Sequence, residues 1–306
     1  MITDLALLAV GDKGFHFTQD VLVAQAGRDF EVAFVVTYEQ MTSSYAIEDF
    51  RDLCSSFGVS LVVDKRPDFG ALAADLIFAV GWQYLVDPSP EGLIVFHDAV
   101  LPEFRGFAPT VSALMAGKDQ LGVTAIRPSS STDAGPIIAQ EVVPIQHPIR
   151  VKDAFALIRP AYLELLIKIC DEFRKTRALE STPQDESRAT YSLWLDELDY
   201  LLDWSRSADE LQRQVFAQSS PYDGSVAVTV RGDKFRVLDA SVVEDVAFVN
   251  RTPGKTWAIT DRGPVVVCGK GLLLIEIGPM ITDGPLETLN LRTRFADIAH
   301  ARALMA

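Results

Sequence analysis

The sequence predicts an α/β protein: a doubly wound, mostly parallel sheet followed by a smaller β-rich domain. Short apolar segments alternate with amphipathic ones through the first half of the chain, which is typical of parallel strands joined by crossover helices. The polar segment 177–188 then lacks any apolar periodicity. After it, short strands separated by Gly, Pro, Asn and Asp indicate an antiparallel barrel or sandwich.

Five short apolar segments predict the parallel strands, at residues 5–10, 31–37, 59–63, 76–80 and 93–97. Amphipathic spacing predicts helices over 17–26 and 46–57, the second ended by Gly58 as a C-cap. Between the first strand and the first helix the sequence reads Gly11-Asp12-Lys13-Gly14, with no GxGxxG or GxxxxGK[ST] pattern. We interpret these glycines as a βα turn, and a dinucleotide or P-loop site is not supported.

The rest of the predicted first domain is a short helix, two strands and a long helix, at 109–116, 122–127, 136–143 and 151–175. The polar segment that follows is the best domain boundary, so we expect one domain over residues 1–180 and a second over 181–306. The second domain is expected to hold a helix at 208–216 and strands at 225–230, 234–238, 256–260, 265–268 and 272–277.

Composition restricts the function. Three cysteines lie far apart with no CxxC pair, which excludes a zinc ribbon and argues against a disulfide framework. The formal charge of −14 disfavours binding to nucleic acid or acidic lipid. No apolar run reaches the length of about 18 residues that a transmembrane helix needs, and the start is too short and acidic for a signal peptide. A cytoplasmic protein is therefore expected.

His97 is the first candidate for catalysis. It ends the apolar run Leu93–His97, which would deliver its side chain to the carboxyl edge of the sheet, where open α/β folds bind ligands. Its ordinary pKa suits proton transfer near neutral pH. A buried histidine bonded to backbone is the alternative interpretation.

Asp133 is the second candidate. It lies in the polar loop 129–135 between two predicted strands, where a carboxylate close to an imidazole would orient it and stabilise its protonated form. Alternatively, Asp133 only starts a turn with Gly135. Spacing along the chain does not tell whether Asp133 and His97 lie close together.

The motifs around these residues resemble those of the formyltransferase superfamily, which includes methionyl-tRNA formyltransferase, glycinamide ribonucleotide transformylase and the sugar N-formyltransferases. The family pattern is Asn-x-His, a Leu-Pro turn, Arg-Gly, Gly-Val-Thr and an Asp-x-Gly loop. The chain carries the sequence LIVFHDAVLPEFRGFAP at 93–109, Gly-Val-Thr at 122–124 and Asp-Ala-Gly at 133–135. The segments 191–204 and 221–224 are similar to the start of the family's C-terminal domain, which is OB-like.

The resemblance implies a formyltransferase-like fold and transfer of a formyl group from 10-formyltetrahydrofolate without a metal. It implies catalytic roles for His97 and Asp133, with Asp133 also ordering a water. It assigns folate contacts to Trp82, Gln83, Tyr84 and Leu85, where the family holds the pteridine, and to Ser131 and Thr132. It assigns substrate contacts to Arg105 and Gly106. Sugar enzymes of the family are commonly dimers, so a homodimer is expected.

One position departs from the family pattern. The family's catalytic Asn, two residues before the His, is replaced here by Val95, and the family's Ser by Ala99. Loss of one oxyanion-stabilising amide typically lowers the rate by about 100- to 1000-fold. Either the oxyanion is held otherwise, by protonated His97 for example, or the chemistry is altered or lost.

The acceptor is expected to be a small amine, and an amino sugar on a nucleotide diphosphate is the leading hypothesis. From residue 190 onward there are 12 Lys and Arg against 16 Asp and Glu, which disfavours tRNA as the partner. The chain is longer than a transformylase that acts on glycinamide ribonucleotide. Two alternatives are a non-catalytic folate- or nucleotide-binding homologue, because of Val95, and a methionyl-tRNA formyltransferase.

Overall fold

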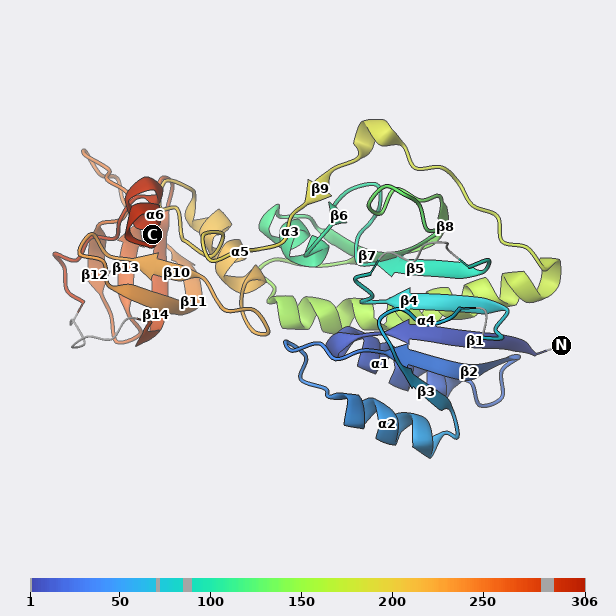
Figure 1. The fold of residues 1–306 in the computed structure, drawn as a ribbon. Coiled ribbons are helices and arrows are strands. Elements are labelled where there is room, and N and C mark those ends of the chain that lie inside the picture. The colour runs from blue at the N-terminus through green and yellow to red at the C-terminus, as the bar shows by residue number, and fades with distance from the viewer. Residues whose placement is uncertain (1, 70–71, 85–89, 282–288, 306) are drawn as a thin grey trace. The chain divides into compact units, whose positions relative to one another are not determined.

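The computed structural model describes residues 2–69, 72–84, 90–281 and 289–305 (Figure 1). The chain divides into two compact units. The first comprises residues 1–106, 121–143 and 157–191, and the second comprises 107–120, 144–156 and 192–306. The segments 107–120 and 144–156 thus belong with the later residues. The single domain boundary expected at residue 180 remains a prediction.

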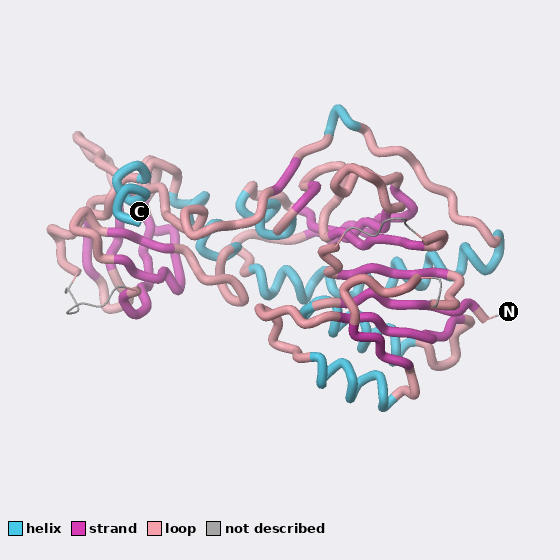
Figure 2. Tube along the Cα trace, in the orientation of Figure 1, coloured by secondary structure: helices cyan, strands magenta, loops and turns pink. Residues whose placement is uncertain are grey.

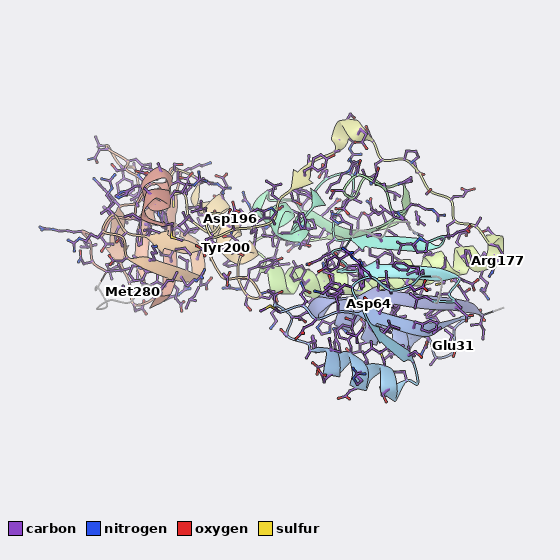
Figure 3. The ribbon with its side chains drawn as sticks, viewed as in Figure 1. Glu31, Asp64, Arg177, Asp196, Tyr200 and Met280 are labelled. Atoms are coloured by element: carbon purple, nitrogen blue, oxygen red, sulfur yellow. The ribbon has the colours of Figure 1, made fainter. Side chains whose placement is uncertain are left out.

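The first unit is built on a seven-stranded sheet with strand order β3-β2-β1-β4-β5-β7-β8. Its strands are β1 (Thr3–Ala9), β2 (Phe30–Thr37), β3 (Ser60–Val63), β4 (Leu76–Val80), β5 (Leu93–His97), β7 (Gln120–Ile126) and β8 (Ile137–Pro144). The first five pair in parallel and β7 runs antiparallel to β5. Glu31, at the start of β2, and Asp64, just after β3, lie toward opposite ends of these strands (Figure 3). The predicted mostly parallel α/β fold is confirmed.

Helices α1 (Gly11–Ala24), α2 (Ile47–Ser56) and α4 (Val151–Thr176) cover one face of this sheet. Their aromatic rings connect them, because Phe15 of α1 contacts Phe50 of α2, and Phe96 of β5 contacts both Phe17 of α1 and Tyr162 of α4. The helix α1 packs closely on β1, since a Cβ at Gly14 would lie 2.6 Å from the carbonyl carbon of Ala9.

The opposite face carries the alternate side chains of the same strands. Its buried cluster contains Ala6, Leu8, Val36, Leu72, Ile77, Ala79 and Leu93. Trp82 and Val95 pack against this cluster. In the described part of the chain no helix separates β3 from β4, so this face is covered by connecting segments.

The second unit contains a five-stranded antiparallel sheet with strand order β10-β11-β14-β13-β12. The strands are β10 (Val226–Val228), β11 (Lys234–Val243), β12 (Thr256–Ile259), β13 (Pro264–Val267) and β14 (Leu272–Met280). Its helices are α3 (Pro109–Met115), α5 (Ala208–Ala217) and α6 (Ile298–Met305). Trp204 and Phe295 lie in its core with Leu211 and Val215 of α5. The predicted C-terminal β-rich domain is confirmed, whereas α6 was not predicted.

A long connecting segment leaves α4 and passes through one helical turn, η1 (Glu186–Arg188), before β9 (Tyr191–Ser192) (Figure 2). The strand β9 pairs with β6 (Arg105–Gly106), which follows the His97 strand. None of the helices in the described ranges is long and apolar enough to cross a membrane.

Candidate functional site

His97 ends β5 and its side chain is held at the carboxyl edge of the sheet. Only 8% of the residue is exposed, and Nε2 lies 2.9 Å from the carbonyl oxygen of Phe104. A carbonyl oxygen can only accept, so Nε2 donates this bond. The neutral ring therefore has its free lone pair on Nδ1.

Asp133 meets this second nitrogen. Its Oδ2 atom lies 3.5 Å from Nδ1 of His97 and accepts a 2.8 Å hydrogen bond from the amide of Gly106. Asp133 has φ +48°, in a turn that the amide of Ala134 closes by donating to the carbonyl of Ser131 at 3.3 Å. Gly135 completes the loop, since a Cβ there would lie 1.7 Å from the carbonyl oxygen of Arg127. The structure thus brings the two residues predicted to be catalytic together.

The environment of His97 favours the neutral imidazole. Burial lowers its pKa, and the positive charge of Lys13 acts in the same direction. The Asp133 carboxylate and the Phe104 carbonyl raise the pKa, but they do not outweigh burial. A neutral histidine whose protonated form is stabilised by a carboxylate is suited to act as a general base.

Thr124, in β7, holds the turn that follows His97. Its hydroxyl donates to the carbonyl of Ala99 at 2.6 Å and accepts from the amide of Leu101 at 3.3 Å. Gln140 of β8 donates to the same hydroxyl at 2.7 Å and to the Leu101 carbonyl at 3.1 Å. Thr124, the last residue of the Gly-Val-Thr motif, therefore stabilises the turn after His97.

Val95 has apolar contacts on both sides. It packs between two apolar clusters, one that includes Trp82 and another that includes Leu101 and Phe104. In strand β5 it alternates with Phe96 and so lies on the same face as His97. An amide at this position would face the site, but the valine supplies no hydrogen bond.

The segment predicted to hold the folate lies just after β4. Trp82 and Tyr84 both contact the ring of Tyr38 edge-on, with centroids 5.0 and 5.1 Å away, and the amide of Gln83 donates to the Tyr38 hydroxyl at 3.4 Å. The Nζ atom of Lys65 lies 5.8 Å from the Tyr38 ring centroid and 5.9 Å from that of Tyr84. Leu85 lies outside the described residues.

Tyr38 and Lys65 were not predicted from the sequence as site residues. The signal was available, since Tyr38 directly follows β2 and Lys65 lies two residues after β3, at the same carboxyl edge as His97. The other two predicted folate contacts, Ser131 and Thr132, are exposed on the Asp133 loop.

Arg105 and Gly106 were predicted to bind substrate. Gly106 contributes its amide to Asp133, while the Arg105 side chain is 1% exposed and donates to the side chains of Gln184 and Glu186. The substrate contact of Arg105 remains a prediction. Gln184 was missed because it lies in the polar segment that has no periodicity.

A second buried polar group adjoins His97. Asp98, whose side chain is 5% exposed, accepts hydrogen bonds from Lys13 of α1 and from the hydroxyl of Tyr162 of α4. Because Lys13 and Tyr162 belong to helices, this group lies on the face of the sheet that α1 and α4 cover. It was not predicted, since Asp98 looked like part of the turn after the strand.

Across the described residues, no three or more His, Cys, Asp or Glu side chains are grouped so that they could hold a metal ion. The chemical groups described above are the histidine–carboxylate pair, the aromatic segment after β4 and the ion pair of Lys13 with Asp98.

Comparisons with known proteins show the family of the chain. Residues 67–159 match the model of the formyl transferase family, and residues 195–279 match the formyl transferase C-terminal domain. A methionyl-tRNA formyltransferase of Roseiflexus castenholzii is 31% identical over 242 residues, which cover 79% of this chain and 71% of that protein. One from Methylobacillus flagellatus is 34% identical over 185 residues, 60% of this chain and 58% of its own length.

Among solved structures, an N-formyltransferase from Helicobacter canadensis in complex with folinic acid and dTDP-3-aminofucose matches with a TM-score of 0.68. The match covers 91% of this chain and all of that one at 13% identity, so it establishes a shared fold. A mostly parallel sheet with a histidine–carboxylate pair at its carboxyl edge is an α/β protein with polar groups where such folds bind ligands. The chain belongs to the formyltransferase family, a class of enzymes that takes its formyl group from a folate-derived donor.

Proposed function

We propose that the protein transfers a formyl group from 10-formyltetrahydrofolate to a small amine, with a nucleotide-linked amino sugar as the acceptor. The observation that carries this proposal is the contact of His97 with Asp133, because both residues lie inside the matched formyl transferase region. The chain spans only 58% of the length of the relative from Methylobacillus flagellatus, so the family assignment by itself leaves the acceptor open.

The geometry supplies a route for the proton. The acceptor amine attacks the formyl carbon, and its proton passes to Nδ1 of His97, because Nε2 already donates to the Phe104 carbonyl. Asp133 stabilises the imidazolium that forms. The bond between the formyl carbon and N10 of the folate then breaks, and the proton on His97 is available to the leaving nitrogen.

The donor is expected to lie against the segment after β4. Trp82, Tyr84 and Tyr38 form an aromatic group there that would contact the pteridine, and Trp82 shares an apolar cluster with Val95 of the His97 strand. This shared cluster supports a formyl group placed between the aromatic segment and the catalytic pair. Ser131 and Thr132 extend from the Asp133 loop as further folate contacts.

A small acceptor agrees with the charge of the chain better than tRNA does, because it brings far fewer phosphates against an acidic protein. The formal net charge is −14, and the residues from 190 onward are acidic overall. The neighbour from Helicobacter canadensis carries dTDP-3-aminofucose in its complex, which makes amino-sugar nucleotides the first acceptors to test. A homodimer remains a prediction that rests on the resemblance, and a cytoplasmic location remains one that rests on the composition.

The direct test mixes the protein with 10-formyltetrahydrofolate and a panel of amino-sugar nucleotides and follows release of tetrahydrofolate together with the mass of the product. The His97→Ala variant serves as the control for background formyl transfer. We expect a formylated product with at least one acceptor. Absence of product with every sugar, together with absence of folate binding by calorimetry, would exclude this function.

Formylation of methionyl-tRNA is the second candidate, because the curated relatives that are 31% and 34% identical have that name. It predicts tRNA binding that weakens steeply as salt rises, since contacts to phosphate release counterions. Formylation of charged initiator tRNA at low salt, with no amino sugar accepted, would replace the leading proposal. No tRNA binding at low salt would exclude this candidate.

A folate-binding protein without transferase activity is the third candidate, and Val95 favours it. It predicts folate binding with no turnover of any acceptor. The Val95→Asn variant separates the possibilities, because a restored amide typically contributes about 100- to 1000-fold in rate where it faces the oxyanion. Turnover that appears only in Val95→Asn would show an enzyme whose oxyanion donor has been lost.

A further inference from the structure

The connecting segment Thr182–Tyr191, which we call the strap, bonds to the loops on both sides of His97. At its start, Thr182 exchanges two backbone hydrogen bonds of 2.8 Å with Ile137, the first residue of β8. At its end, the carbonyl of Thr190 accepts from the amide of Arg105 at 2.9 Å. Backbone hydrogen bonds therefore anchor the strap at both ends, to β8 and to β6.

Gln184 links the strap to the Asp133 loop. Its Nε2 atom donates to the carbonyls of Asp133 and Gly135, at 2.7 Å each, and the residue is 9% exposed. Its Oε1 atom accepts from Nε and NH2 of Arg105 at 3.0 and 2.9 Å. One buried side chain thus holds the backbone of the catalytic carboxylate on one side and a guanidinium on the other.

Arg105 in turn is held by the strap. Its guanidinium donates to both oxygens of Glu186, at 2.9 and 2.7 Å, and to the hydroxyl of Tyr191 at 3.2 Å. Such a bidentate pair restricts the orientation of the guanidinium plane. Since Arg105 immediately precedes Gly106, the amide that bonds Asp133 belongs to the same fixed stretch of chain.

Thr190 supports the opposite side of His97. Its hydroxyl accepts a 2.8 Å hydrogen bond from the amide of Phe104, the residue whose carbonyl holds Nε2 of the imidazole. Phe104 has φ +60° and Asp133 has φ +48°, both in the left-handed region that non-glycine residues adopt at a cost of about 1 kcal/mol or more. Each of these two conformations is therefore paired with a hydrogen bond from the strap.

We propose that Gln184 and Thr190 are positioning residues for formyl transfer, which hold Asp133 and Phe104 on the two nitrogens of His97. The proposal rests on the proposed function for its kinetic consequence, but the geometry it describes can be measured without turnover. It also gives Arg105 the role of orienting Gln184. Displacement of catalytic groups by about 1 Å can lower a rate by about 100-fold, so loss of either contact should be measurable.

The titration of His97 tests this without any substrate. The chain has four histidines, so the proton resonance of the His97 ring can be assigned by comparison with a His97→Asn variant. Gln184→Met keeps the length of the side chain but removes the amide that donates to the carbonyls of Asp133 and Gly135. Asp133→Asn serves as the reference for loss of the carboxylate. We expect the His97 midpoint to move to lower pH in Gln184→Met, in the same direction as in Asp133→Asn.

Thr190 offers a matched pair. Thr190→Ser keeps the acceptor hydroxyl and should titrate like the wild type, whereas Thr190→Val removes it and should lower the His97 midpoint. Ser187→Ala changes a strap residue whose hydroxyl donates to Asp185, on the exposed side, and serves as the control. If formyl transfer is found, Gln184→Met and Thr190→Val should lower kcat by about 10- to 100-fold with little change in KM.

A His97 midpoint that is unchanged in folded Gln184→Met and Thr190→Val would overturn the proposal. A fall in melting temperature with that midpoint unchanged would have the same meaning, since the strap would then only support the fold. A wild type without formyl transfer would reject the proposed function, while the titration would still decide whether the strap positions the pair.

Discussion

Asp133 lies against Nδ1 of His97, the one ring nitrogen that does not bond to the backbone. His97 ends β5 and Asp133 lies in the loop after β7, and Nδ1 of His97 is 3.5 Å from Oδ2 of Asp133. The Phe104 carbonyl fixes the other nitrogen as the donor. The proposed proton transfer to His97 would therefore use Nδ1, and the first two predictions below depend on that assignment.

Asp133→Asn should change the pH dependence of the reaction. The carboxylate raises the pKa of His97, so its removal should lower that pKa further. His97 must be neutral to accept the amine proton, and the acid limb of kcat/KM should therefore move to lower pH. The maximal rate should fall by about 100-fold or more, because the imidazolium is no longer stabilised.

The measurement is a pH profile of kcat/KM for the wild type and Asp133→Asn with the same acceptor. Asp185→Asn, an exposed carboxylate of the strap, is the control that changes the net charge equally. An acid limb that moves to higher pH would show that Asp133 does not act through His97.

His97→Ala should abolish turnover and leave the protein folded. General base catalysis typically contributes about 100- to 10,000-fold, and the imidazole is the group placed to supply it. The melting temperature and the circular dichroism spectrum should stay close to those of the wild type. Folate affinity should also be retained, because the aromatic segment is unchanged, and a folded variant with full activity would refute the assignment.

Asp98→Ala should strongly destabilise the first unit. It would leave the buried Tyr162 hydroxyl and the Lys13 ammonium without their shared carboxylate. Breaking a buried ion pair typically costs about 3–5 kcal/mol, and because 38% of the Lys13 side chain is exposed, we expect the lower end of that range. Tyr162→Phe removes one bond and should cost about 1–3 kcal/mol. Denaturant unfolding measures both.

Asp29→Ala provides the matched control. It breaks the ion pair of Asp29 with Arg174, whose side chains are 60% and 38% exposed, so the change should stay within about 1 kcal/mol. Equal effects of Asp98→Ala and Asp29→Ala would show that the buried group contributes nothing beyond a surface pair.

Glu210→Gln should make the stability of the second unit less sensitive to pH in the acid range. Glu210 closes the capping box of α5, where hydrogen bonds from Ser207 lower its pKa from 4.5 to about 2. A depressed carboxylate pKa stabilises the folded state above the unfolded value, and this contribution is lost as pH falls from about 4.5 toward 2. The variant should lose about 1 kcal/mol at neutral pH and less in acid.

Unfolding of the full chain at pH 7 and at pH 3, monitored by a signal from Trp204 in the core of this unit, measures the effect. Asp209→Asn, in the same first turn, is the control for the charge near the helix terminus. A loss that is larger at pH 3 than at pH 7 would contradict the capping assignment.

Most elements could be predicted because their periodicity is local. The bounds of β4 and β5 are those predicted, and α2, α3, α4 and α5 differ by one residue at each end at most. The helix α1 begins at Gly11 instead of residue 17, because its glycines, read as a turn, form the first helical turn packed on β1. Strand β11 extends to Val243, where pairing with β14 continues past the predicted end.

The sequence by itself determined the family and singled out His97 and Asp133, which the structure brings into contact. An apolar run that ends in His97 and a polar loop that carries Asp133 can be read from residue order, because strand ends and turns follow local composition. The sequence also identified Val95 as the departure from the family pattern. These features depend on neighbouring residues only.

The tertiary structure alone decided which groups surround that pair. Gln184 and Thr190 reach it from a segment without periodicity, and Asp98 bonds to Lys13 and Tyr162 from two helices far apart in the chain. Which side chains meet in this way depends on strand order and on the path of the connecting segments. Hydrogen bonds between distant segments leave no local pattern, so the roles of these residues follow from the fold.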